Sequence, residues 1–253
     1  TVTASGPTTF CQGSSVTLSA PAGYTYLWSD GTTAQSITAS TAGSYSVTVT
    51  SNGCSSTSAA QTVVVNPVPP STVTASGSLT FCQGGSVTLS APNGYSYLWS
   101  SGATTQSITA FAAGSYSVTV SANGCSSTSA AQAVVVNPLP SSAVSVSGSL
   151  TFCQGSSVTL SAPAGYSYLW SNGATTQSIT ASTAGSYSVT VSANGCSSTS
   201  AAQAVVVNPV PPSTVTASGP LTFCQGGSVS LSAPTGYSYL WSSGATTQSI
   251  TAF

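Results

Sequence analysis

Residues 24–29 have the sequence Tyr-Thr-Tyr-Leu-Trp-Ser, and nearly the same six residues return three more times along the chain. Large apolar side chains separated by one residue are typical of a β-strand that buries one face. The tryptophan belongs to the face that the pattern predicts to be inside. We therefore expect it in a core rather than on a sugar-binding surface. The four tryptophans are Trp28, Trp99, Trp170 and Trp241.

The rest of the sequence repeats with the same period of 71 residues. The predicted repeats are residues 1–71, 72–142, 143–213 and 214–253. The fourth repeat stops at Phe253, before two of the predicted strands and the second cysteine. Two explanations stay open. Either the sequence is a window on a longer array, or strands from another chain complete the fourth repeat.

Each repeat predicts a series of short strands between turns. Asn52-Gly53 is typical of a type I′ hairpin turn, and the proline-rich residues 66–70 predict a stiff, extended linker. Short strands, a core tryptophan and a Gly-x-Tyr corner together predict an all-β chain of tandem immunoglobulin-like β-sandwiches. In the first repeat the expected strands are residues 1–5, 15–20, 24–29, 33–40, 44–49 and 59–65.

Charged side chains are almost absent, and this excludes several classes of function. Asp30 is the only one, since the chain has no Lys, Arg, His or Glu. General acid–base catalysis and metal sites need such groups, so we expect no enzyme, no cofactor and no metal. Nucleic-acid binding depends on Lys and Arg, and we expect none. No apolar run approaches the ~20 residues that span a bilayer, so we expect no membrane insertion.

The cysteines of a small secreted domain normally form disulfides. Each complete repeat carries two, and the matched pairs favour bonds within a repeat. A standard immunoglobulin topology would instead separate Cys11 and Cys54 by far more than the ~7 Å limit between Cα atoms. A bond between neighbouring repeats, such as Cys11 with Cys125, is then the alternative. The within-repeat pairs are Cys11–Cys54, Cys82–Cys125 and Cys153–Cys196, which leaves Cys224 without a partner.

Two sets of apolar residues are predicted to point away from the core. One set is the leucine that directly precedes each core tryptophan and points to the opposite side of the same strand. The other set lies within a run of three valines. If both strands share a sheet, each repeat exposes an apolar stripe suited to self-association. Isolated apolar surface residues are the alternative. The residues are Leu27, Leu98, Leu169, Leu240, Val64, Val135 and Val206.

The order of motifs in each repeat resembles the immunoglobulin-like and PKD-like repeats of large secreted surface proteins of Bacteroidota, including their gliding adhesins. This resemblance implies export by the type IX system, a place at the cell surface, and a role in adhesion or filament building. The motifs that carry it are Phe10-Cys11, Gly13, Tyr26, Trp28-Ser29, Thr33, Gln35, Ile37, Ala42-Gly43-Ser44-Tyr45, Val47, Val49 and Asn52-Gly53-Cys54.

The function expected from these patterns is structural and extracellular. A net charge near zero gives little repulsion between copies, so a fibre of self-associated repeats is the leading hypothesis. A passive stalk of a cell-surface adhesin is the first alternative. A module that binds cell-surface or environmental glycans through several identical repeats is the second. The chain begins without Met and without a targeting segment, as expected for a mature or excised piece of a secreted protein.

Overall fold

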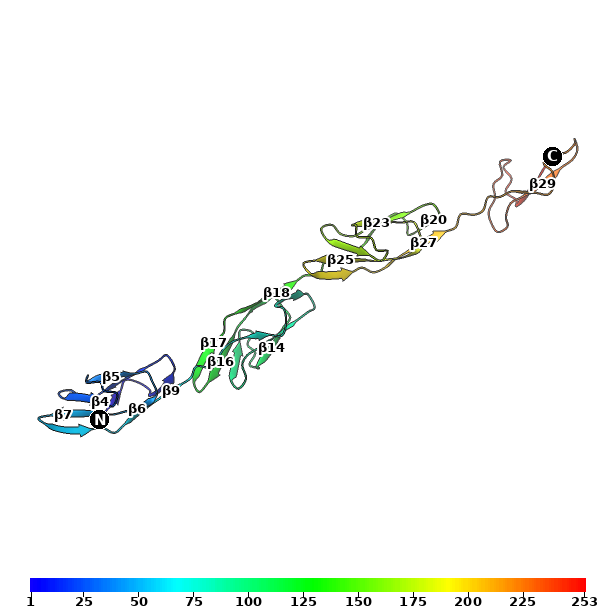
Figure 1. The fold of residues 1–253 in the computed structure, drawn as a ribbon. Coiled ribbons are helices and arrows are strands. Elements are labelled where there is room, and N and C mark those ends of the chain that lie inside the picture. Colours follow the sequence, from blue (N-terminus) through cyan, green and yellow to red (C-terminus); the bar gives the residue numbers. More distant parts are fainter. The chain divides into compact units, whose positions relative to one another are not determined.

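The computed structural model describes residues 1–253 and contains strands but no helix. It forms two compact units, Thr1–Pro138 and Leu139–Phe253. The first holds all the strands of repeats 1 and 2, and the second holds those of repeats 3 and 4 (Figure 1).

Repeat 1 contains nine short strands, bounded by turns rich in Gly, Ser and Asn. They are β1 (Thr3–Ala4), β2 (Thr9–Cys11), β3 (Val16–Ser19), β4 (Thr25–Trp28), β5 (Ser36–Ala39), β6 (Gly43–Tyr45), β7 (Val47–Ser51), β8 (Cys54–Thr57) and β9 (Gln61–Asn66).

Repeats 2 and 3 have the same strands in the same order. In repeat 2 they are β10 (Thr74–Ala75), β11 (Thr80–Cys82), β12 (Val87–Ser90), β13 (Ser96–Trp99), β14 (Ser107–Ala110), β15 (Gly114–Tyr116), β16 (Val118–Ala122), β17 (Cys125–Thr128) and β18 (Gln132–Asn137). In repeat 3 they are β19 (Ser145–Ser147), β20 (Thr151–Cys153), β21 (Val158–Ser161), β22 (Ser167–Trp170), β23 (Ser178–Ala181), β24 (Gly185–Tyr187), β25 (Val189–Ala193), β26 (Cys196–Thr199) and β27 (Gln203–Asn208).

The strands of repeat 1 pair in the manner of an immunoglobulin-like sandwich. One sheet has the order β1-β3-β5 and is antiparallel. On the other side, β4-β7-β8 and β2-β9-β6 form two three-stranded ladders. β6 and β7 are separated only by Ser46, so they are two parts of one extended segment that changes partner from β9 to β4. The predicted fold class, tandem immunoglobulin-like β-sandwiches, is confirmed by this strand order.

The core of repeat 1 lies between the two sides of the sandwich. Leu18 from β3 is fully buried and packs in one cluster with Trp28 from β4. Trp28 is only 2% exposed, and its indole N–H donates to the carbonyl of Ala34 at 2.8 Å. A buried indole needs such a partner, because an unsatisfied N–H costs free energy. Repeats 2 and 3 have equivalent cores around Trp99 and Trp170.

A tyrosine corner fixes the turn that leads into β6. The hydroxyl of Tyr45 donates to the carbonyl of Thr41 at 3.0 Å. Tyr116 and Tyr187 make the same bond to the carbonyls four residues upstream. This feature marks the corresponding corner in many immunoglobulin-like domains. The Gly-x-Tyr signal in the sequence therefore predicted a real structural element.

Two strands of repeat 1 were not predicted from the sequence, and one predicted strand is divided into two. β2 pairs in parallel with β9, and β8 pairs with β7 across the Asn52-Gly53 turn. β2 has only three residues and β8 has no alternation of apolar and polar side chains. The predicted strand 44–49 is split at Ser46 into β6 and β7.

Repeat 4 has one sheet, formed by β28 (Thr216–Ala217), β29 (Val229–Ser232) and β30 (Ser249–Ala252). This sheet corresponds to β1-β3-β5 of repeat 1. Residues 238–241 form no strand, because the sequence holds no equivalent of the strand that pairs with β4. Trp241 is consequently only half-buried.

Candidate structural site at the repeat junction

The two cysteines of repeat 1 lie at opposite ends of the sandwich. Cys11 is the last residue of β2 and pairs with Asn66, the last residue of β9, where the chain enters the linker. Cys54 opens β8 at the tip of the Asn52-Gly53 hairpin. The sequence pattern placed that hairpin correctly, and the positive φ angles of Asn52 (51°) and Gly53 (78°) are those of a type I′ turn.

The strand register shows why these two cysteines cannot bond to each other. Cys11 lies on β2 beside β9, and β9 pairs with the start of β6, where Val63 faces Gly43. Cys54 instead pairs with Ser51 at the end of β7. From Gly43 to Ser51 the strand advances ~26 Å at about 3.3 Å per residue. That is several times the separation that a disulfide spans.

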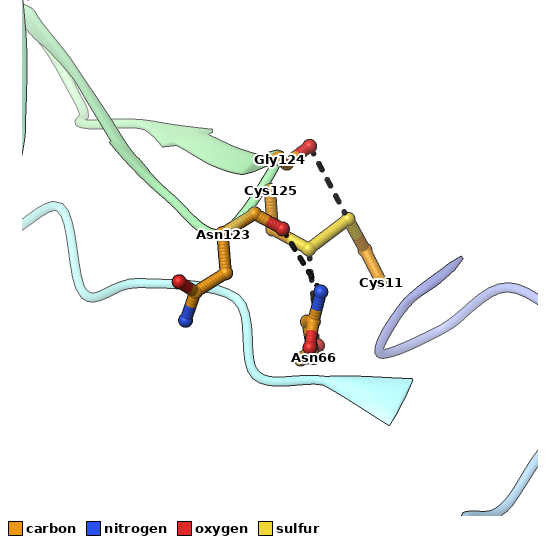
Figure 2. The surroundings of a disulfide bond; sticks show 5 residues. All are labelled: Cys11, Asn66, Asn123, Gly124 and Cys125. Atoms are coloured by element: carbon orange, nitrogen blue, oxygen red, sulfur yellow. Dashed lines mark hydrogen bonds between the residues drawn. A yellow bond between two sulfur atoms is a disulfide. The ribbon is translucent and has the colours of Figure 1, made fainter. Parts of the chain in front are cut away.

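Cys11 instead bonds to Cys125 of repeat 2, with a Cα–Cα distance of 5.6 Å (Figure 2). The favoured prediction of a Cys11–Cys54 bond is therefore wrong, and the alternative between neighbouring repeats is correct. The physical reason is the standard topology, which brings the end of one repeat close to the hairpin tip of the next. Within-repeat pairing also fails for Cys82–Cys125, since Cys125 is taken, and for Cys153–Cys196, since Cys153 is free.

The disulfide lies within a polar junction between the two repeats. The side-chain amide of Asn66 donates to the carbonyl of Asn123 at 2.9 Å, as Figure 2 shows. The sulfur of Cys11 lies 3.7 Å from the carbonyl oxygen of Gly124. The hairpin tip of repeat 2 is thus held by both a covalent bond and a hydrogen bond.

The linker completes the junction. Pro69 is buried, and its carbonyl accepts a hydrogen bond of 2.6 Å from the hydroxyl of Ser127 on β17. Cys125 itself is 1% exposed. The linker therefore packs along the hairpin of the repeat that follows it, and this reduces the freedom of that repeat to swing.

The remaining cysteines fall into two groups. Cys82 and Cys196, which follow Cys11 and Cys125 by one repeat length, are both disulfide-bonded. Cys54, Cys153 and Cys224 are free and exposed. Sequence reasoning found every cysteine but missed Asn66, Asn123 and Ser127. The recurrence of Asn next to each linker and each hairpin Gly was the available signal.

The candidate self-association residues are exposed, but they do not share a sheet. Leu27 on β4 is 54% exposed and Val64 on β9 is 43% exposed. β4 and β9 belong to different ladders, so the condition for one continuous stripe is not met. The other members, Leu98, Leu169, Leu240, Val135 and Val206, are exposed as well.

The one charged side chain, Asp30, takes part in a local turn. Asp30 accepts a hydrogen bond from the backbone N–H of Thr32 at 3.0 Å, as in an ordinary Asx turn. No group of three or more His, Cys, Asp or Glu side chains comes together. No helix with the length and apolar character of a membrane span occurs in the structure.

Comparison with known proteins gives structural neighbours only. No family model and no curated protein matches the chain. The D1–D4 ectodomain fragment of ICAM-5 is 12% identical, with 82% of this chain and 76% of that chain covered and a TM-score of 0.44. Murine CEACAM1b is 14% identical over 51% and 96%, with a TM-score of 0.28. The N-terminal four Ig domains of Dscam1 isoform 8.4 are 12% identical over 88% and 81%, with a TM-score of 0.24.

Proposed function

We propose that this chain is a non-enzymatic, extracellular structural protein, the tension-bearing shaft of a surface fibre or filament. The observation that carries the proposal is the disulfide between Cys11 and Cys125. It joins the end of one repeat to the hairpin of the next, where a flexible tandem array would have only the linker. Persistent disulfides also suit an oxidising, extracellular setting.

The bond changes how a pulling force would travel along the chain. Tension applied at Thr1 reaches Cys11, crosses to Cys125 and continues toward Pro138. The 113 residues between the two cysteines lie outside this path. Their sandwich folds cannot be drawn out while the bond is intact, so the length of the shaft is fixed under load.

Single-molecule force spectroscopy tests this proposal. One handle is attached at Thr1. The other is attached at exposed position 131, where Ala131 is replaced by a residue whose reactive group is not a thiol. The oxidised chain is expected to release only short segments. Addition of a reductant, or Cys11→Ser, is expected to release about 370–410 Å more, at about 3.3–3.6 Å per residue. Cys54→Ser changes a free cysteine and is the matched control. An oxidised chain that extends by the full length would refute the shaft.

The lateral packing of a filament rests on the exposed apolar residues. Leu27 lies on the outer face of the β4-β7-β8 ladder opposite Thr48, Leu98 and Leu169 occupy the same position in repeats 2 and 3, and Leu240 is exposed in repeat 4. The bond between the hydroxyls of Thr48 and Thr57 holds this uncharged surface together. Replacing the four leucines by serine is expected to abolish concentration-dependent association in sedimentation. Unchanged association would place the contact elsewhere, whereas an unsubstituted chain that stays monomeric at high concentration would leave a passive adhesin stalk as the better description.

The resemblance to repeats of secreted Bacteroidota proteins supports the same proposal at a finer level. It implies export by the type IX system and a place at the cell surface. A glycan-binding module is less well supported, because Trp28, Trp99 and Trp170 are buried.

A further inference from the structure

Repeat 2 differs from repeats 1 and 3 in the turn that connects β14 and β15. Residues 111–112 are Phe-Ala, whereas the same positions hold Ser-Thr at 40–41 and at 182–183. Phe111 is 68% exposed, although the other aromatic side chains of repeat 2 pack in or against its core. The surroundings of the ring decide whether it is an isolated surface residue or part of a site.

Phe111 borders a groove of about 540 Å³. Thr109 also lines this groove, and it lies on the same side of the chain as Phe111 because side chains two positions apart along a strand share a face. Ser101 adds a second exposed hydroxyl. It stands where repeat 1 has Asp30, the only charged side chain, so the groove is lined by an aromatic ring and neutral hydroxyls.

The tyrosine corner beside the groove has lost a partner that it has in the neighbouring repeats. The hydroxyls of Tyr45 and Tyr187 each lie 2.9 Å from the hydroxyl of a threonine four residues upstream. Ala112 stands at that position in repeat 2, and Tyr116 keeps only its bond to the Ala112 carbonyl at 3.1 Å. Because a phenol oxygen can accept as well as donate, Tyr116 brings an unused acceptor to the groove that it lines.

The apolar part of the groove is also more open than in repeats 1 and 3. Ile108 lines the groove and is only partly buried, whereas its equivalents Ile37 and Ile179 are 6% and 7% exposed. The Phe-Ala turn thus coincides with an exposed ring, a tyrosine hydroxyl without a side-chain partner, and a less covered isoleucine. A single apolar surface residue would account for the first of these features but not for the other two.

We propose that this groove binds a neutral saccharide, with Phe111 stacked on the apolar C–H face of a sugar ring. Ligand sites combine apolar or aromatic surface with a few placed polar groups, as this groove does. Sugar hydroxyls donate and accept hydrogen bonds, and the hydroxyls of Ser101, Thr109 and Tyr116 match them in both respects. Acidic sugars would find no cation here, because the chain has no Lys, Arg or His.

The saccharide site goes beyond the proposed shaft, which bears load with or without a bound sugar. It does not involve the buried tryptophans, so the cores of the repeats keep a purely structural role. The site belongs to repeat 2 and not to repeats 1 and 3, which have Ser40 and Ser182 in place of the aromatic ring.

The test begins with the full 253-residue chain, kept oxidised, on an array of neutral oligosaccharides of glucose, galactose, mannose and N-acetylglucosamine. Binding to a neutral oligosaccharide is expected, and binding to polygalacturonate, an acidic polysaccharide, is not. Isothermal titration calorimetry then measures the affinity for the array sugar that binds best. Every titrated chain carries Phe253→Ser, because a phenylalanine stands at the same position of repeat 4.

Phe111→Ser restores the residue of repeats 1 and 3, and it is expected to weaken binding by about tenfold or more. Leu98→Ser, at another exposed apolar residue of repeat 2, is the matched control and is expected to leave the affinity unchanged. Ala112→Thr returns a hydroxyl partner to Tyr116 and is expected to weaken binding although the aromatic ring remains.

A gain-of-function variant separates a binding site from a merely structural role. Ser182→Phe/Thr183→Ala builds the same turn in repeat 3 and is expected to double the number of sugars bound per chain. A chain that binds no neutral sugar, or binds equally well after Phe111→Ser, would overturn the proposal. Loss of concentration-dependent association in Phe111→Ser, without any sugar bound by the parent chain, would assign the ring to a contact between copies instead. The force experiment on single chains would be unaffected by these results.

Discussion

At the scale of single residues, each sandwich depends on a few buried side chains whose polar atoms are satisfied locally. Trp28 and Tyr45 are large, and each uses its one donor on a nearby carbonyl. The sequence pattern predicted both positions, because a central-strand tryptophan and a Gly-x-Tyr corner are local signals. Their hydrogen-bond partners, Ala34 and Thr41, followed only from the structure, because loop conformation is not encoded by alternation.

Tyr45→Phe is the sharpest test of the tyrosine corner. The ring stays, but the bond to the carbonyl of Thr41 is lost. We expect the free energy of unfolding to fall by about 0.5–1.5 kcal/mol, the usual net value of one hydrogen bond. Urea denaturation followed by tryptophan fluorescence measures it. Tyr24→Phe, at a half-exposed tyrosine of the same repeat, is the control, and an equal loss there would argue against the corner.

At the scale of elements, the sequence predicted strands better than it predicted their partners. Alternating Val16 and Leu18 identified β3, and the Asn-Gly pair identified the β7–β8 turn. β2 was not predicted, because three residues are too few to show a periodic pattern. Its parallel partner β9 could not be predicted either, because it lies about 55 residues further along the chain. The change of partner strand at Ser46 could not be predicted either, because apolar and polar side chains alternate without a break from Tyr45 to Val47.

Gly53→Ala tests the hairpin whose equivalent in repeat 2 carries Cys125, the partner of Cys11. Gly53 has a φ angle of 78°, which an L side chain adopts at a cost of about 1–2 kcal/mol. We expect a loss of stability of that size in repeat 1. Gly6→Ala is matched for open space, since neither added Cβ meets an atom within 4 Å, and Gly6 does not have a positive φ. Equal effects of the two substitutions would mean that the turn is not type I′.

At the scale of the whole chain, the disulfide pattern was the part that the sequence left open. Matched cysteine pairs in each repeat favoured bonds inside the sandwich. The deciding fact was the position of Cys11 at the linker end and Cys54 at the hairpin end, which depends on the pairing of β2 with β9. Local patterns do not contain that information, since non-local register is set by the assembled sheet.

The bond between repeats should therefore stabilise two sandwiches at once. Cys11 and Cys125 enclose a loop with a sequence separation of 114, and closing such a loop restricts the unfolded chain more than closing a short loop does, although the effect grows only slowly with length. We expect the double variant Cys11→Ser/Cys125→Ser to lose about 2–4 kcal/mol of unfolding free energy, with repeats 1 and 2 unfolding in separate transitions. Calorimetry of the oxidised chain resolves those transitions, and Cys54→Ser should leave them unchanged. If the double variant keeps one joint transition, the linker and the Asn66–Asn123 hydrogen bond suffice to couple the repeats, and the covalent bond serves only under load.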